Sequence, residues 1–110
     1  MRRFTILLAG AFVLQSYLHA APAFAWDRQV ERGRTLARTE CARCHAVGRT
    51  GASPLPQAPP FRTLHRRYPV DDLGEALTEG IRTGHPSMPE FRFDRDEAEA
   101  LIAYLKSLER

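Results

Sequence analysis

The sequence predicts an all-α fold in which three main helices are joined by long loops. Apolar residues recur at helical spacing in three stretches, whereas no stretch alternates polar and apolar residues as a strand does. Prolines and glycines crowd two connecting stretches, 48–60 and 84–93, in which neither a helix nor a central strand persists. Because loops this long in a small chain need something to pack on, we expect the fold to enclose a bound group.

The first predicted helix begins at Asp27, a residue type that caps helix N-termini. Its apolar face is formed by Val30, Gly33, Leu36 and Ala37. The middle helix is expected from about Asp71 to Ile81, with Asp71 and Asp72 at its positive end. Its buried face is formed by Leu73, Ala76 and Leu77.

The last helix is predicted to begin at Asp94, with Glu97 three residues further on. This spacing resembles a capping box with aspartate in place of serine or threonine. A single apolar stripe follows, formed by Ala98, Leu101, Ile102, Leu105 and Leu108.

Residues 1–25 have the pattern of a secretory signal peptide. Arg2 and Arg3 give a basic start, an apolar run reaches Leu14, and Ala23 and Ala25 are the small residues that a signal peptidase reads. The run is shorter than the roughly 20 residues that cross a bilayer. We therefore expect a cleaved signal, rather than a retained membrane anchor or a buried helix. The mature domain is then residues 26–110, located in the periplasm without stable membrane insertion.

The charge of the chain, formally +3, says little about its partners. The two leading arginines are removed with the signal, and all 13 acidic residues remain, so the mature domain is close to neutral. Its arginines are scattered rather than clustered, so no nucleic acid partner is expected.

The two cysteines occur in a C-x-x-C-H motif, Cys41 to His45, the pattern of covalent c-type haem attachment. On a helical turn, residues i and i+3 share a face, so both thiols can reach the two vinyl groups of one porphyrin. Cys41 and Cys44 would form the thioethers, and an imidazole nitrogen of His45 would bind the iron. The predicted cofactor is one haem c per chain.

Three other interpretations of the cysteines remain open. A redox dithiol usually occurs in a thioredoxin-like βαβ unit, and no strands are predicted here. A disulfide between Cys41 and Cys44 would close a very small loop, and zinc would need further ligands.

Met88 is the predicted second axial ligand, because Met1 leaves with the signal and no other methionine remains. A thioether favours reduced iron and raises the reduction potential. The alternatives are that Met88 only packs on its neighbours, or that His85, three residues away, is the ligand. His65 has neither spacing nor context to recommend it.

The mature chain resembles class I cytochrome c, the small soluble mono-haem electron carriers. The C-x-x-C-H motif, Gly33 eight residues before it, and the stretch Leu101–Lys106 all match that family. The resemblance implies three helices with long loops around one haem, and a close crossing at which Gly33 meets Leu101 and Tyr104. Ala37 departs from the family, which usually has a large aromatic residue there.

The resemblance also implies two further cofactor-binding residues. A backbone carbonyl of the 58–61 stretch, assigned to Pro60 in preference to Pro59, is expected to accept a hydrogen bond from the second imidazole nitrogen of His45. If it does not, the prolines only make a rigid turn. Tyr68 is expected to bind a haem propionate or to line the pocket, unless it is a half-buried surface residue.

The expected function is electron transfer without substrate chemistry, so the protein is not predicted to be an enzyme. Its partners would be redox proteins: a respiratory complex, a terminal oxidase or a periplasmic dehydrogenase. Arg43 and Arg49 flank the motif and could help to form the docking surface. A monomer is expected. Two alternatives are a haem-based sensor of small ligands and a dedicated electron-accepting subunit of one dehydrogenase.

Overall fold

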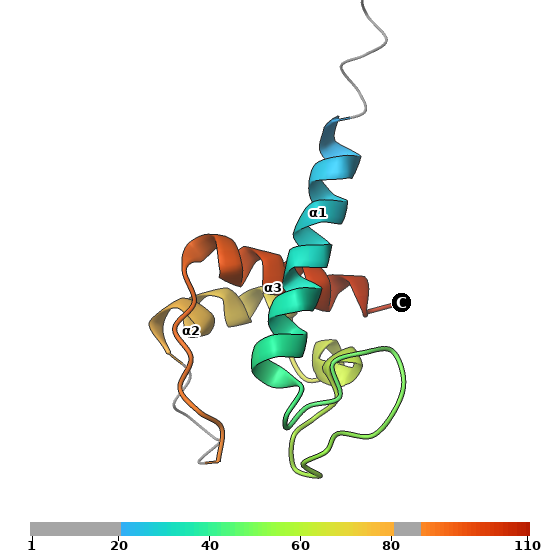
Figure 1. Cartoon of the computed structure of the whole chain (residues 1–110), viewed down its shortest axis with the longest axis vertical. Coiled ribbons are helices and arrows are strands. Elements are labelled where there is room, and N and C mark those ends of the chain that lie inside the picture. Colours follow the sequence, from blue (N-terminus) through green and yellow to red (C-terminus); the bar gives the residue numbers. More distant parts are fainter. Residues whose placement is uncertain (1–20, 81–86) are drawn as a thin grey trace, which may run out of the picture.

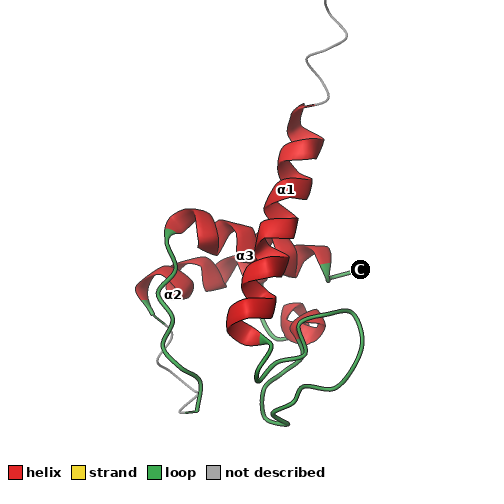
Figure 2. Cartoon of the chain, in the orientation of Figure 1, coloured by secondary structure: helices red, strands yellow, loops and turns green. Residues whose placement is uncertain are grey.

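The computed structural model describes residues 21–80 and 87–110, and all regular structure in them is helical. Helix α1 spans Ala21–Leu36 and continues as a π-helical turn, Ala37–Cys41. Two 3-10 helices, Phe61–Arg66 and Val70–Asp72, precede α2, which spans Leu73–Glu79. Helix α3 spans Arg95–Ser107. These ranges contain no strand, which confirms the all-α prediction (Figure 2).

Helix α1 begins earlier than the predicted start at Asp27. Alanine has the highest helix propensity, and proline is tolerated in a first turn, so the segment from Ala21 through Pro22 extends the helix. Residues 23–28 are all exposed, and Figure 1 shows this end of α1 projecting away from the other helices. Asp27 is therefore not the first residue of the helix in the full chain, and the predicted start is wrong.

Helix α2 is shorter than the predicted 71–81 helix. Asp71 and Asp72 belong to a 3-10 turn, and the α-helix ends at Glu79. Gly80 ends it because this residue has φ +103°, a conformation that favours glycine, and its N–H donates to the carbonyl of Ala76 at 2.9 Å. The last predicted position, Ile81, lies outside the described residues.

Helices α1 and α3 cross in close contact at Gly33. A Cβ atom added to Gly33 would overlap the backbone carbonyl oxygen of Ala100 and lie 2.8 Å from Cβ of Tyr104. Ala37, one turn further along, is fully buried. Figure 1 shows α1 passing across α3, so the predicted helix crossing is confirmed, with Ala100 rather than Leu101 beside Tyr104 as the nearest neighbour of Gly33.

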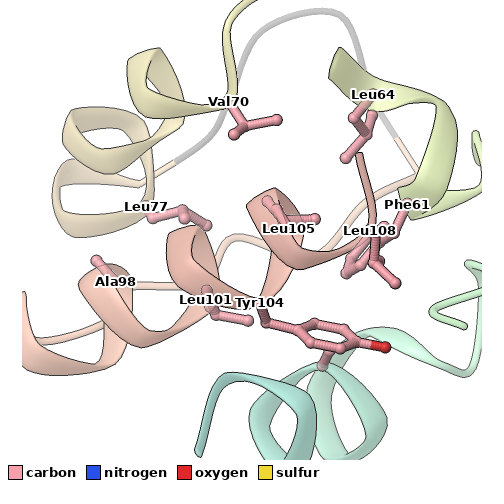
Figure 3. Packing of buried hydrophobic residues seen from close by; sticks show 10 residues of the cluster. Phe61, Leu64, Val70, Leu77, Ala98, Leu101, Tyr104, Leu105 and Leu108 are labelled. Carbon is pink, nitrogen blue, oxygen red and sulfur yellow. The ribbon is translucent and has the colours of Figure 1, made fainter. Parts of the chain in front are cut away.

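The core lies on one face of α3. Helix α3 starts with the predicted capping box. The N–H of Glu97 donates to the side-chain carboxylate of Asp94 at 2.8 Å, and the N–H of Asp94 donates to the side-chain carboxylate of Glu97 at 3.1 Å. Figure 3 shows how α2 and the two 3-10 helices cover this face. The buried side chains drawn there include Leu64, Val70, Leu77, Leu101, Leu105 and Leu108. Among the described residues, no helix is both long and apolar enough to span a bilayer.

Candidate haem site

A cavity of about 680 Å³ opens at the C-terminal end of α1. Two irregular segments, 46–58 and 87–94, extend on either side of this end of the helix (Figure 1). The cavity is lined by Cys41, Cys44 and His45 from the motif and by Met88 from the second segment. Its other lining residues are Thr39, Glu40, Arg43, Leu55, Gln57, Ala58, Pro59, Ser87, Pro89 and Phe91. The structure thus brings Met88 to the same cavity as the three residues of the motif.

A tight turn after α1 presents the three chemically active residues of the motif. The helix widens into the π-helical turn that ends at Cys41, a local geometry that is frequent at functional sites. The carbonyl of Cys41 then accepts two hydrogen bonds, from the N–H of Cys44 at 3.2 Å and from the N–H of His45 at 3.0 Å. These bonds hold both thiols and the imidazole at one wall of the cavity.

The thiol of Cys41 is unsuited to act as a redox nucleophile in this environment. Its pKa is raised to about 11, chiefly by burial and to a lesser extent by the neighbouring charges of Glu40 and Cys44. A dithiol oxidoreductase requires the opposite, a lowered pKa that exposes a thiolate. Both cysteines are partly buried. The local electrostatics therefore disfavour the dithiol interpretation.

His45 is oriented by a proline carbonyl, but the proline is Pro59 and not Pro60. Nδ1 of His45 lies 2.8 Å from the carbonyl oxygen of Pro59. A carbonyl can only accept, so Nδ1 carries the proton and Nε2 keeps its lone pair for a metal. The ring also packs against Phe61, with centroids 5.0 Å apart.

The carbonyl of Pro60 is already used by the 3-10 helix that follows it. Pro60 is the N-cap residue of that helix. Its carbonyl oxygen accepts hydrogen bonds from the backbone N–H of Thr63 at 3.0 Å and from the hydroxyl of Thr63 at 2.8 Å. The assignment to Pro60 is wrong for this reason. The start of a helix at Phe61 was the signal that could have identified Pro59, because an N-cap carbonyl accepts the first intrahelical bond.

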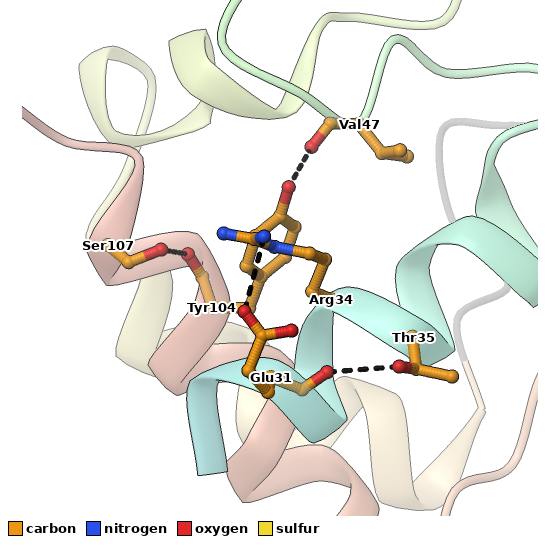
Figure 4. A network of polar contacts seen from close by, with 6 residues as sticks. All are labelled: Glu31, Arg34, Thr35, Val47, Tyr104 and Ser107. Atoms are coloured by element: carbon orange, nitrogen blue, oxygen red, sulfur yellow. Dashed lines mark hydrogen bonds and ion pairs between the residues drawn. The ribbon is translucent and has the colours of Figure 1, made fainter. Parts of the chain in front are cut away.

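The long loop after the motif is attached to both the motif and α3. The N–H of Leu55 donates to the carbonyl of Cys44 at 3.1 Å, which ties the loop to the motif. The hydroxyl of Tyr104 donates to the carbonyl of Val47 at 2.5 Å (Figure 4). Arg49 donates from Nη2 to the carbonyl of Ser107 at 2.8 Å, at the C-terminal end of α3 where a cation is favourable.

Removing the hydroxyl of Tyr104 tests the attachment of this loop to α3. In a Tyr104→Phe variant, the carbonyl of Val47 loses its donor, and we expect the free energy of unfolding to fall by about 1 kcal/mol. Urea denaturation of the haem-loaded protein, followed by far-UV circular dichroism, measures the change. A variant as stable as the wild type would show that the bond does not hold the loop.

Met88 belongs to the segment that returns from α2 to α3. It is half-buried, between the exposed residues Ser87 and Pro89. Phe91 follows, and its ring stacks on that of Phe93 with centroids 5.7 Å apart. A thioether at a cavity wall, away from the cluster of core residues, is placed to bind a ligand rather than to fill the core.

The remaining predicted residues lie elsewhere. Tyr68 is not among the residues that line the cavity and is 37% exposed, so the structure does not place it at the cavity wall, and its role in binding a haem propionate stays a prediction. Burial of part of its side chain raises the pKa of its phenol, while Arg67 opposes this shift. His65 is on the 3-10 helix and half-buried, with no hydrogen-bond partner at Nδ1 among the described residues. His85 lies outside them.

The residues of the cavity fit a haem better than the competing groups. Its lining includes Leu55, Ala58 and Phe91, which suit an apolar porphyrin face, and its size is within the range of ligand and cofactor sites. His45 offers an oriented imidazole and Met88 a thioether, the pair found in cytochromes c. Within residues 21–80 and 87–110, no three His, Cys, Asp or Glu side chains gather as they would around a metal ion such as zinc.

Three of these lining and packing residues were not predicted from the sequence. Leu55, Phe61 and Phe91 lie in or beside irregular segments, and the sequence contains no periodic signal that would assign them to the site.

The fold and the site together define a small c-type haem protein, in which the two thiols of the motif attach the cofactor.

Comparison with known proteins agrees with that class. The sequence profile of the family "Cytochrome c" matches residues 30–109. The chain is also similar to a protein named "Cytochrome c-552" from Bradyrhizobium diazoefficiens, with 37% identity over 76 residues, 69% of this chain and 71% of the relative. No solved structure matches. The chain belongs to the cytochrome c family, and it binds haem c covalently through Cys41 and Cys44.

Proposed function

We propose that the protein is a periplasmic one-electron carrier, with His45 and Met88 as the two axial ligands of its haem. The observation that carries the proposal is the shared cavity, whose wall includes an imidazole and a thioether from segments far apart in the chain. When bound, the haem supplies a metal centre that takes up and releases one electron.

The chain's own residues have distinct parts in this function. Pro59 fixes the ring of His45 in the tautomer that leaves Nε2 free, and a carbonyl partner makes the imidazole a better ligand. Leu55 and Phe91 keep water from the cofactor faces. Met88 raises the reduction potential by favouring reduced iron. The role proposed for this set is to hold the haem while it takes up and releases an electron.

Export fits the exposed start of α1. Cleavage after Ala25 would remove only exposed side chains among those that are described, and Trp26 and Asp27 would then begin the helix. The mature domain would keep Gly33, Ala37 and every core residue intact. The N-terminal sequence of the protein purified from the periplasm tests this proposal, and a chain that still carries residues 1–25 would contradict it.

Its partners are proposed to be redox proteins that dock at the mouth of the cavity. Arg43 is exposed and lines this mouth, whereas Arg49 is bound to the end of α3. Arg43 is therefore the better candidate for a docking charge. Such interfaces are small, and charge governs their association rate.

Carbon monoxide distinguishes a carrier from a sensor of small ligands. If Met88 occupies the sixth coordination position, adding carbon monoxide should not change the absorption spectrum of the reduced protein. A rapid shift of the spectrum under the same conditions would favour the sensor and contradict the proposal.

A further inference from the structure

The segment that carries Met88 is attached to the C-terminal end of α2 at two points. The N–H of Phe93 donates to the carbonyl of Leu77 at 2.9 Å. The side chain of Glu90 lies directly on Gly80: a Cβ atom at Gly80 would be 2.5 Å from Oε1 of Glu90 and 3.2 Å from both Cγ and Cδ. A side chain at position 80 would force the carboxylate of Glu90 to move, and the φ of +103° at Gly80 also disfavours any other residue.

The carboxylate of Glu90 is held from a second direction by Arg92. Nε and Nη2 of Arg92 each lie 3.3 Å from Oε1 of Glu90. The side chain of Arg92 is 67% exposed and that of Glu90 is 32% exposed. An ion pair this accessible to solvent contributes little by itself.

These contacts restrict Met88 because Glu90 is only two residues further along. Pro89 stands between them and limits φ, so the connection is short and stiff. Met88 therefore lies two residues from a point at which the chain is anchored to the end of α2, and this anchoring leaves its side chain fewer positions.

We propose that Glu90 is a positioning residue: its side chain, packed on Gly80, holds Met88 against the cavity and thereby sets how firmly the thioether binds the haem iron. The proposal rests on Met88 being the second axial ligand. Glu90 is not among the residues that line the cavity, so it would act on the cofactor only through Met88.

The strength of the Met88 bond is measured by competition with added imidazole in the oxidised, haem-loaded protein. Imidazole must displace the thioether, so a poorly held Met88 gives a higher apparent affinity. We expect Glu90→Ala to raise the affinity about tenfold and to lower the reduction potential. Glu75→Ala, on the exposed face of α2, is the matched control and should behave as the wild type.

Two conservative variants separate packing from charge, and they keep the test informative if Glu90→Ala fails to accumulate. Glu90→Gln keeps the carbons that lie on Gly80 and should stay close to the wild type. Glu90→Asp keeps the charge but shortens the side chain, and it should raise the imidazole affinity. A Glu90→Gln variant with a higher imidazole affinity than Glu90→Asp would overturn the proposal. A Glu90→Ala variant with the same imidazole affinity as Glu75→Ala would also overturn it.

Met88→Ala distinguishes this failure from a failure of the axial assignment. If Met88 is the ligand, its removal should raise the imidazole affinity more than any Glu90 variant does. An unchanged affinity in Met88→Ala would overturn both the axial assignment and the positioning role. A raised affinity in Met88→Ala, with no change in Glu90→Ala and Glu90→Asp, would overturn the positioning role alone.

Discussion

Replacing Gly33 with alanine is expected to destabilise the haem-loaded protein by about 2–3 kcal/mol. The new methyl group would overlap the carbonyl oxygen of Ala100 and press on Cβ of Tyr104 at 2.8 Å. Ala100 presents a backbone atom and Tyr104 the first atom of its side chain, so neither can rotate away and the helices must move apart. Because Tyr104 also holds Val47, we expect the loop beside the motif to loosen as well.

Gly74→Ala is the matched control for this substitution. Gly74 is inside α2, and a Cβ atom there would meet nothing within 4 Å. Since alanine is the better helix former, this variant should be as stable as the wild type or up to about 1 kcal/mol more stable. Urea midpoints of the two variants measure the difference. Equal midpoints would show that the crossing at Gly33 can accept a side chain.

Replacing Met88 with alanine is expected to have the largest effect on redox behaviour. The variant keeps the haem, which the two thioethers hold, but loses the ligand that favours reduced iron. We expect the reduction potential to fall by on the order of 0.1 V, a modest part of the range that axial ligands control. The reduced variant should also bind carbon monoxide, because no protein ligand then occupies the sixth position.

Ser87→Ala is the control for Met88→Ala, since Ser87 is an exposed neighbour that also lines the cavity. It should keep the potential and the spectrum of the wild type. Redox titration and carbon monoxide difference spectra measure both variants. A Met88→Ala protein with an unchanged potential and no carbon monoxide binding would contradict the axial assignment and direct attention to His85.

Local signals in the sequence predicted much of the fold. The capping box at Asp94 and Glu97 depends only on residues three apart, so it could be identified without knowing the tertiary structure. The start of α1 was predicted wrongly because Asp27 was treated as a cap, although the alanine-rich segment before it continues the helix. The end of α2 at Gly80 depends on a positive φ, which a glycine permits but does not require.

The candidate site, like the fold, could be predicted from the sequence only in part. The motif from Cys41 to His45 and the isolated Met88 were visible as residue types at characteristic positions, and the structure brings them to one cavity. The choice between Pro59 and Pro60 depended on which carbonyl the next helix uses, and that is a matter of hydrogen bonding rather than of residue type. The contact of Glu90 with Gly80 joins two segments whose approach no local pattern predicts.

Extraction of the purified protein with acidified acetone, followed by absorption spectra of the oxidised and reduced forms, tests the central claim most directly. We expect the haem to stay with the polypeptide, one per chain, because Cys41 and Cys44 hold it by thioether bonds. We also expect the reduced spectrum of the native protein to be that of a haem with both axial positions filled. Haem that passes into the acetone phase, or a protein that carries none, would contradict the account.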